Sequence, residues 1–214
     1  MRRTLNRQGL GVDKLIKSMG PAEVTGLLLG YENYFLSLYE DQIRLKRLME
    51  MVTEFIIEWL HLQETSLGEA ELLQIADHVP SQVNPEHMEK FILPYLRAIY
   101  SEFPNLVKIY HNEGFHSDRH IEDVLQFGAD IWHFGSDVHR LSDVYDKICD
   151  AMVTFGGINP IGPMRYGSPE EVRKETKEVL TAARGRRLLL STGTGTSPEV
   201  TLENIRAMIE TAAE

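Results

Sequence analysis

VKIYH (107–111), ADIWHFG (129–135) and TFGGINP (154–160) are the stretches that decide the fold of this 214-residue chain. Each is a short apolar run that ends in polar or glycine-rich residues and precedes a segment of helical character. Two similar runs flank them, LLQIAD (72–77) and RRLLLST (186–192). Strands that alternate with helices form a parallel sheet, because parallel neighbours need crossover connections.

The helical segments carry their own signals. Asn84 before Pro85 and the box Ser168-Pro169-Glu170-Glu171 are typical helix starts, Asp118 can cap a third helix, and Pro94 predicts a kink. Apolar residues at three- and four-residue steps between 45 and 60 predict one long amphipathic helix near the N-terminus. Its expected core face is Leu45, Leu48, Met49, Val52, Phe55, Ile56, Trp59 and Leu60.

The spacing of the strand–helix units favours a (β/α) barrel over an open nucleotide-binding sheet, and no GxGxxG or Walker-type loop is present. A closed barrel of this class has eight strands and roughly 250 residues. We therefore predict an α/β fold: an incomplete TIM (β/α) barrel with about five parallel strand–helix units plus the long N-terminal helix. Residues 1–19 are interpreted as an N-terminal extension and 20–214 as the barrel part.

The net charge of -10, from 32 acidic and 22 basic residues, disfavours nucleic acid or an anionic membrane as a partner. No apolar stretch approaches the ~20 residues of a membrane span. Cys149 is the only cysteine, which excludes an intrachain disulfide and a multi-cysteine metal site, and we expect it to be a packed thiol. A cytoplasmic location fits these features.

Ligands bind at the carboxyl ends of parallel strands, where the candidate site residues fall. Asp77 ends an apolar strand, which is costly for an acid unless it is paired or wet, and we assign it a site role ahead of its neighbour His78. His111 and Glu113 flank one residue, so their side chains can face the same side. His133 alternates with Trp132, and we expect His133 to face the barrel interior.

The remaining polar candidates are weaker. Asn159 follows the strand that contains Gly156 and Gly157. His116, His120 and His139 lie in loop or helix, where we expect them to be solvated.

Several longer motifs together resemble the uroporphyrinogen decarboxylase superfamily over roughly residues 20–214. They are GPAEVTGLLLGYENYFLSLYED (20–41), Asp77 with NPEHMEKFILPYLRAI (84–99), YHNEG (110–114), GGINPIGPMRYGSPEEVRKETKEVL (156–180) and TGTGTSPEVTLENIRAMIE (192–210). The superfamily includes porphyrinogen decarboxylases and corrinoid-dependent methyltransferases, all on a TIM barrel. The resemblance implies the C-terminal part of such a barrel, a substrate role for Asp77 and an amide facing the pocket at Asn159.

The methyltransferase branch holds zinc with a His-x-Cys-Gly pattern and a second cysteine in the last glycine turn. The matching positions here are His111-Asn112-Glu113-Gly114 and Gly193-Thr194-Gly195. His111 and Glu113 can still bind zinc, with a third ligand from His116, His133 or Asp77. The decarboxylase branch expects a histidine where Thr194 stands and N-terminal arginines that this chain lacks, leaving Arg165 as the basic residue of its loop.

The resemblance favours a zinc-assisted methyltransferase that moves a methyl group between a small methylated substrate or thiol and a corrinoid carried by a partner protein. Asp77 and His133 are its expected catalytic residues, and Asp77, Asn159, Arg165 and Thr194 its expected substrate contacts. The alternatives are a uroporphyrinogen decarboxylase of porphyrin biosynthesis and a non-catalytic accessory subunit or fragment of a longer enzyme. An incomplete barrel exposes strand edges, so we also expect a homo-oligomer or a second chain that completes it.

Overall fold

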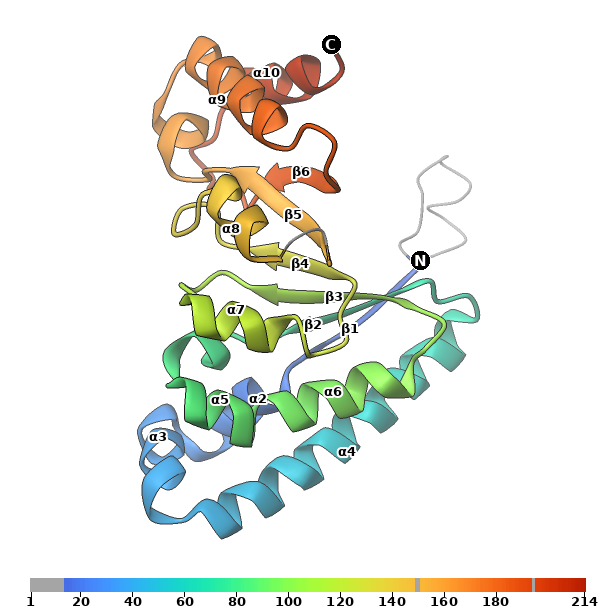
Figure 1. Ribbon diagram of the computed structural model, residues 1–214. Coiled ribbons are helices and arrows are strands. Elements are labelled where there is room, and N and C mark those ends of the chain that lie inside the picture. Colours follow the sequence, from blue (N-terminus) through green and yellow to red (C-terminus); the bar gives the residue numbers. More distant parts are fainter. Residues whose placement is uncertain (1–13, 149–150, 194) are drawn as a thin grey trace.

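The computed structural model describes residues 14–148, 151–193 and 195–214, which form one six-stranded sheet and its surrounding helices (Figure 1). The strands are β1 (Leu15–Met19), β2 (Leu72–Ala76), β3 (Val107–Asn112), β4 (Ile131–Phe134), β5 (Val153–Ile158) and β6 (Leu188–Thr192). The α-helices are α2 (Pro21–Leu29), α3 (Tyr31–Glu40), α4 (Gln42–Leu67), α5 (Pro85–Phe91), α6 (Leu93–Glu102), α7 (Asp118–Val124), α8 (Leu141–Ile148), α9 (Pro169–Ala182) and α10 (Leu202–Ala212). Two short helical turns, η1 (Val79–Gln82) and η2 (Gly162–Tyr166), follow β2 and β5.

The sheet is wholly parallel, and its strands lie side by side in chain order from β1 to β6. This is the strand order of a (β/α) barrel wall. Within the described residues β1 and β6 are the two edges, and no strand joins them. The predicted incomplete TIM barrel is confirmed, with one strand more than the sequence indicated.

The two faces of the sheet differ in burial. The face under the helices is fully packed and contains Ile16, Leu73, Ile75, Tyr110, Trp132, Phe134 and Ile158. The opposite face, which would line a closed barrel, is only partly covered. Level with one another across it lie Met19, Ala76, His111, His133, Phe155 and Leu189, with Met19 and Leu189 each about half exposed.

The long amphipathic helix predicted over residues 45–60 is confirmed as α4, and two shorter helices, α2 and α3, precede it. Gly30, at φ 80°, separates α2 from α3, and Asp41 caps α4 by accepting the backbone N–H of Arg44. α4 buries Leu45, Met49, Val52, Ile56 and Leu60 as predicted. Phe55 and Trp59 instead lie on its outer side, 64% and 44% exposed, so their assignment to the core was wrong.

Three further local expectations differ from the structure. Residues 15–19, interpreted as part of an extension, form strand β1 and pair with β2. The helix expected to be capped by Asp118 is capped by Ser117, whose side chain accepts the backbone N–H of His120. The kink expected at Pro94 is a break at Ile92, between α5 and α6. Cys149 lies outside the described residues.

The described helices include none that is both long enough and apolar enough to cross a membrane.

Candidate metal centre at the carboxyl ends of β2 and β3

His111 and His133 lie side by side on the uncovered face of the sheet, at the carboxyl ends of β3 and β4. The strand register places them opposite each other. Their Nδ1 atoms are 2.8 Å apart, so one ring donates its N–H to the other. His133 also stacks on Phe155 of β5, with 4.1 Å between ring centroids, while Trp132 packs on the helix-covered face as its alternation with His133 requires.

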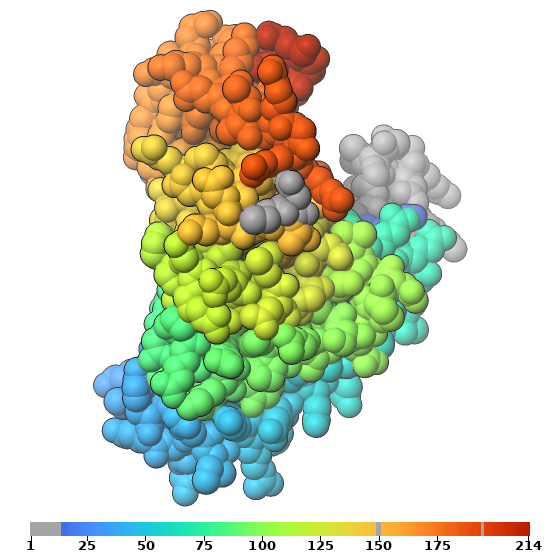
Figure 2. Space-filling view, in the orientation of Figure 1, coloured from blue at the N-terminus to red at the C-terminus, as the bar shows by residue number. Residues whose placement is uncertain are grey.

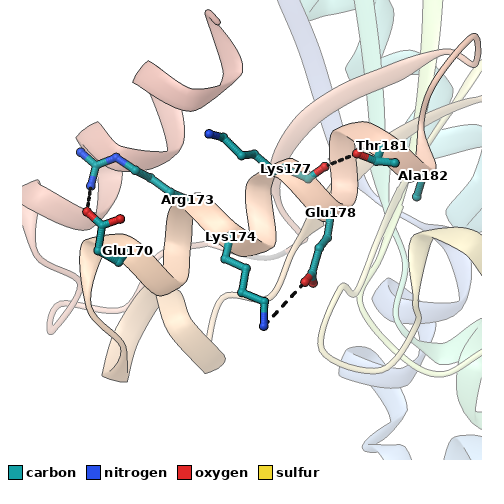
Figure 3. Close-up of a pocket in the computed structure, with 7 residues that line it drawn as sticks. All are labelled: Glu170, Arg173, Lys174, Lys177, Glu178, Thr181 and Ala182. Atoms are coloured by element: carbon teal, nitrogen blue, oxygen red, sulfur yellow. Dashed lines mark hydrogen bonds and ion pairs between the residues drawn. The ribbon is translucent and has the colours of Figure 1, made fainter.

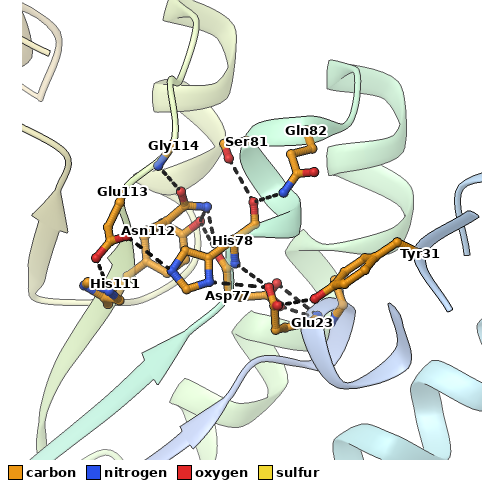
Figure 4. Close-up of polar contacts among 12 residues, drawn as sticks. Glu23, Tyr31, Asp77, His78, Ser81, Gln82, His111, Asn112, Glu113 and Gly114 are labelled. Carbon is orange, nitrogen blue, oxygen red and sulfur yellow. Dashed lines mark hydrogen bonds and ion pairs between the residues drawn. The ribbon is translucent and has the colours of Figure 1, made fainter. Parts of the chain in front are cut away.

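His78, His111 and Glu113 form the candidate metal centre (Figure 4). One ligand atom from each lies within 4.8 Å of the other two. Nε2 of His111 is 3.3 Å from one carboxylate oxygen of Glu113, and Nε2 of His78 is 4.0 Å from the other. The two rings stand at 90° to each other, so both present a ring edge to the carboxylate.

The sequence had placed His111 and Glu113 together but offered His116, His133 or Asp77 as the third residue. The structure brings His78 instead. Ala76 is level with His111 in the sheet, and His78 and Glu113 each follow two residues after this pair. That alignment of β2 and β3 was the missing signal, because the sequence alone does not state the register of two parallel strands.

Burial lowers the basicity of the paired rings. The pKa of His111 is lowered to about 4 by burial and then by the nearby His78, and the pKa of His133 is lowered to about 4 by burial and then by His111. Both imidazoles are therefore neutral at neutral pH, which is the form that binds a metal ion.

Asp77 lies beneath this group, fully buried, and both of its carboxylate oxygens are occupied. Oδ2 accepts the backbone N–H of Ala22 at 3.0 Å, and Oδ1 accepts that of Glu23 at 3.1 Å. Burial, followed by the charge of Glu23, raises the pKa of Asp77 to about 8 against the opposing effect of these backbone donors. The structure thus uses Asp77 to hold the first turn of α2, and its expected contact with substrate stays a prediction.

The other expected substrate contacts are tied up locally or not described. The Asn159 side chain accepts the backbone N–H groups of Ile161 and Gly162, both at 2.9 Å, and so shapes the turn after β5. The Arg165 guanidinium donates to Glu199 at 2.9 Å. Thr194 lies outside the described residues. The roles of all three stay predictions.

His116, His120 and His139 belong to a different cluster. They lie on the helix side of the sheet around Trp132, and the expectation that they are solvated was wrong for His116 and His120, which are 2% and 8% exposed. Nδ1 of His116 lies 2.9 Å from the carbonyl oxygen of Gly114. His116 is not part of the group formed by His78, His111 and Glu113.

A cavity of about 420 Å³ adjoins the candidate metal centre on the uncovered face of the sheet. It is lined by Lys17, Ser18, Met19, Gln74, Ala76, His78 and His111. A small molecule in this cavity would contact His78, His111 and Lys17.

A wider hollow, of about 680 Å³, lies on the outer flank of α9 (Figure 3). Every residue that lines it belongs to that helix, and its charges are neutralised along the helix, Arg173 with Glu170 and Lys174 with Glu178. It is far along the chain from the strand ends that carry the histidines, and we assign it no chemistry.

Fold and site together define a partial (β/α) barrel protein with a His/His/Glu group at the carboxyl ends of two neighbouring strands. The chain belongs to the uroporphyrinogen decarboxylase (URO-D) family, whose model matches residues 3–214. That match extends into the segment that the sequence had suggested was an extension.

Curated relatives carry the same family name, and a solved structure shares the fold. The chain is 27% identical to a uroporphyrinogen decarboxylase of Hydrogenobaculum sp., in a match that covers 83% of this chain and 50% of the relative. It is 30% identical to a uroporphyrinogen decarboxylase of Geobacter metallireducens, in a match that covers 76% of this chain and 47% of the relative. It therefore spans about half the length of these curated relatives. In fold it is similar to a methyltransferase from Methanosarcina mazei, with a TM-score of 0.82 and 19% identity over 99% of this chain and 61% of the other.

Proposed function

We propose that this protein transfers a methyl group between a small methylated substrate or thiol and a corrinoid carried by a partner protein, with zinc bound by His78, His111 and Glu113. The observation that carries the proposal is the convergence of two imidazoles and one carboxylate within 4.8 Å at the strand ends. The fold similarity to a methyltransferase supports the same reaction class.

The donor set fits zinc. Two neutral imidazole nitrogens and one carboxylate oxygen are zinc ligands, and three protein ligands leave a fourth position for substrate, as in catalytic rather than structural sites. When bound, zinc would supply Lewis-acid chemistry, activating a thiol or polarising the group whose methyl is transferred. Glu113, 38% exposed at its side chain, is free to close on an ion between the two rings.

The surrounding residues bind and orient. His133 fixes the His111 ring through the Nδ1 pair, which leaves Nε2 of His111 directed at Glu113. The cavity beside His78 and His111 is large enough for a small methylated molecule, and Lys17, which also lines it, would favour one with a negative group. The low pKa of His133 keeps its ring neutral at neutral pH, where it serves as a hydrogen-bond partner of His111, and its expected catalytic role stays a prediction.

The proposal is tested by methyl transfer to free cobalamin, with a panel of methoxylated aromatics, methanol, methylamines and thiols, after loading with one equivalent of zinc. We expect zinc-dependent transfer from or to one class of the panel and its loss in His111→Ala. A protein that retains no zinc and shows no transfer would point to the accessory-subunit alternative.

Uroporphyrinogen decarboxylation remains the second candidate, because the curated relatives carry that name. The pairing of Arg165 with Glu199 argues against a polycarboxylate at the end of β5, since that cation is already neutralised. Carbon dioxide release from uroporphyrinogen without added metal would favour the decarboxylase.

Assembly is part of the proposal. The open edges of β1 and β6 fit a second chain that adds the remaining strands of an eight-stranded barrel. Atoms of α4, cyan in Figure 2, lie at the surface of the molecule. The apolar side chains that α4 exposes fit a second copy of the chain. We therefore propose a homo-oligomer or a second chain that completes the barrel.

A further inference from the structure

Glu23 holds the far side of the His78 ring. It lies in the first turn of α2, and its carboxylate is 3.5 Å from Nδ1 of His78 while also accepting the backbone N–H of His78 at 3.0 Å. Its other oxygen accepts the hydroxyl of Tyr31 (Figure 4). A single carboxylate thus holds the backbone of His78 by a hydrogen bond, lies beside one of its ring nitrogens, and is itself held by a phenol.

The His78 ring consequently lies between two carboxylates with different roles. Nδ1 faces Glu23, which is only 14% exposed at its side chain, and Nε2 faces Glu113 at the candidate metal centre. A histidine that binds a metal through one nitrogen commonly gives the N–H of its other nitrogen to a carboxylate, which selects the tautomer and orients the ring. Glu23 occupies the position of that second carboxylate.

The placement of Glu23 is electrostatically unfavourable in itself. Its charge lies near the buried carboxyl of Asp77 and disfavours ionisation there. A neutral side chain would avoid this repulsion and still link α2 to the loop after β2. Glutamate offers what a neutral residue does not, a charged acceptor 3.5 Å from Nδ1 of His78, within reach of its ring N–H.

We propose that Glu23 is a positioning residue that fixes His78 in the tautomer and orientation needed to bind a metal through Nε2, and that Tyr31 holds Glu23 in place. This inference rests on the proposed metal centre and adds two residues of α2 and α3 to it. Neither residue has a place in the zinc site that the family resemblance implies.

The test compares zinc affinity of the purified wild-type chain with that of Glu23→Gln, Tyr31→Phe and a matched surface variant, Glu32→Gln, by competition with a chromophoric chelator. We expect Glu23→Gln to weaken zinc binding about 10- to 100-fold, the usual effect of removing such a partner. Tyr31→Phe should weaken it less, and Glu32→Gln should match the wild type. Visible spectra with cobalt(II) in place of zinc should shift in Glu23→Gln.

A double-mutant cycle separates positioning from a general structural role. If Glu23 acts through His78, Glu23→Gln should have no further effect on zinc affinity in a His78→Ala background. Equal affinities of wild type and Glu23→Gln, or an undiminished effect of Glu23→Gln without His78, would overturn the inference and leave the metal centre intact. A wild-type chain that binds no zinc would overturn the metal centre and this inference together.

Discussion

At the scale of single residues, Asp77 supplies the cap that α2 lacks. Gly20 precedes α2 and has no side chain that could cap it. The first backbone N–H groups of α2 therefore need acceptors from elsewhere in the chain. The buried carboxyl of Asp77 accepts two of them from the neighbouring strand. Its elevated pKa makes this cap sensitive to pH.

We predict that the free energy of unfolding of Asp77→Asn increases relative to that of the wild type as pH rises from 5 to 8. The pKa of Asp77 is about 8 in the folded chain, above its unfolded value of 3.8, so the folded state retains a proton that the unfolded state releases. Its favourable contribution is complete below the unfolded pKa and is lost as pH rises to the folded pKa, by up to about 1.4 kcal/mol per pH unit. Asparagine keeps an acceptor oxygen and does not ionise.

Urea unfolding of both proteins at four pH values in this range measures the difference directly. A stability difference that is the same at pH 5 and pH 8 would contradict the buried-carboxyl interpretation.

At the scale of elements, the junction between β1 and α2 depends on the absence of a side chain at Gly20. Its φ of -77° is open to any residue, so backbone freedom is not the reason for glycine. A Cβ there would lie 2.2 Å from Oδ2 of Asp77. Strand, turn and capping carboxyl therefore meet at a point that admits only hydrogen.

Gly20→Ala is expected to destabilise the chain by about 1–3 kcal/mol through this overlap. Gly195→Ala, whose Cβ would meet nothing within 4 Å, is the matched control. Chemical denaturation measures both. The cost at Gly20 should shrink in an Asp77→Ser background, and a cost that does not change there would show that the clash with Asp77 is not the cause.

The outer side of α4 is the second element with a testable consequence. Ile43, Met51, Phe55, Trp59 and Leu62 form one stripe along it, each between 44% and 86% exposed. We predict that Phe55→Glu with Trp59→Glu converts the proposed homo-oligomer to a smaller species, because charges would be buried in the contact.

Sedimentation at micromolar concentration measures this change, with Leu202→Glu on α10 as an exposed apolar control. An unchanged sedimentation coefficient in the double variant would show that the contact between copies does not involve the outer side of α4.

Local signals predicted most elements, and contacts between elements account for what was missed. The Ser168–Glu171 box and the cap at Asn84 were legible because their bonds lie within four residues. β1 was missed because its sequence, LIKSM, contains the polar residues Lys17 and Ser18 and therefore shows no continuous apolar run. His78 was undervalued because its partners come from α2 and β3, more than thirty positions away.

At the scale of the whole molecule, several buried histidines set the response to acid. Burial lowers the pKa of His116 to about 3 and those of His111 and His133 to about 4. Each ring stays neutral when folded and takes up a proton when unfolded below pH ~6.5. Their stabilising contribution is therefore present above that value and is lost as pH falls to the folded pKa.

For the zinc-free chain we predict that the free energy of unfolding falls between pH 6.5 and 4.5, by up to about 1.4 kcal/mol per pH unit for each such ring. His116→Gln should reduce the slope of this pH dependence by an amount equal to about one proton taken up on unfolding. The packing cost of the substitution, measured at pH 7.5, is subtracted first. An identical slope in wild type and variant would show that His116 takes up no proton on unfolding.

The donor set of the candidate metal centre comes entirely from the ends of β2 and β3, two neighbours within the sheet and not its edges. Only one strand pairing has to form before the three groups face one another. On the proposed function, zinc binding would therefore not depend on closure of the barrel, and a metal bound early would fix the register of β2 against β3.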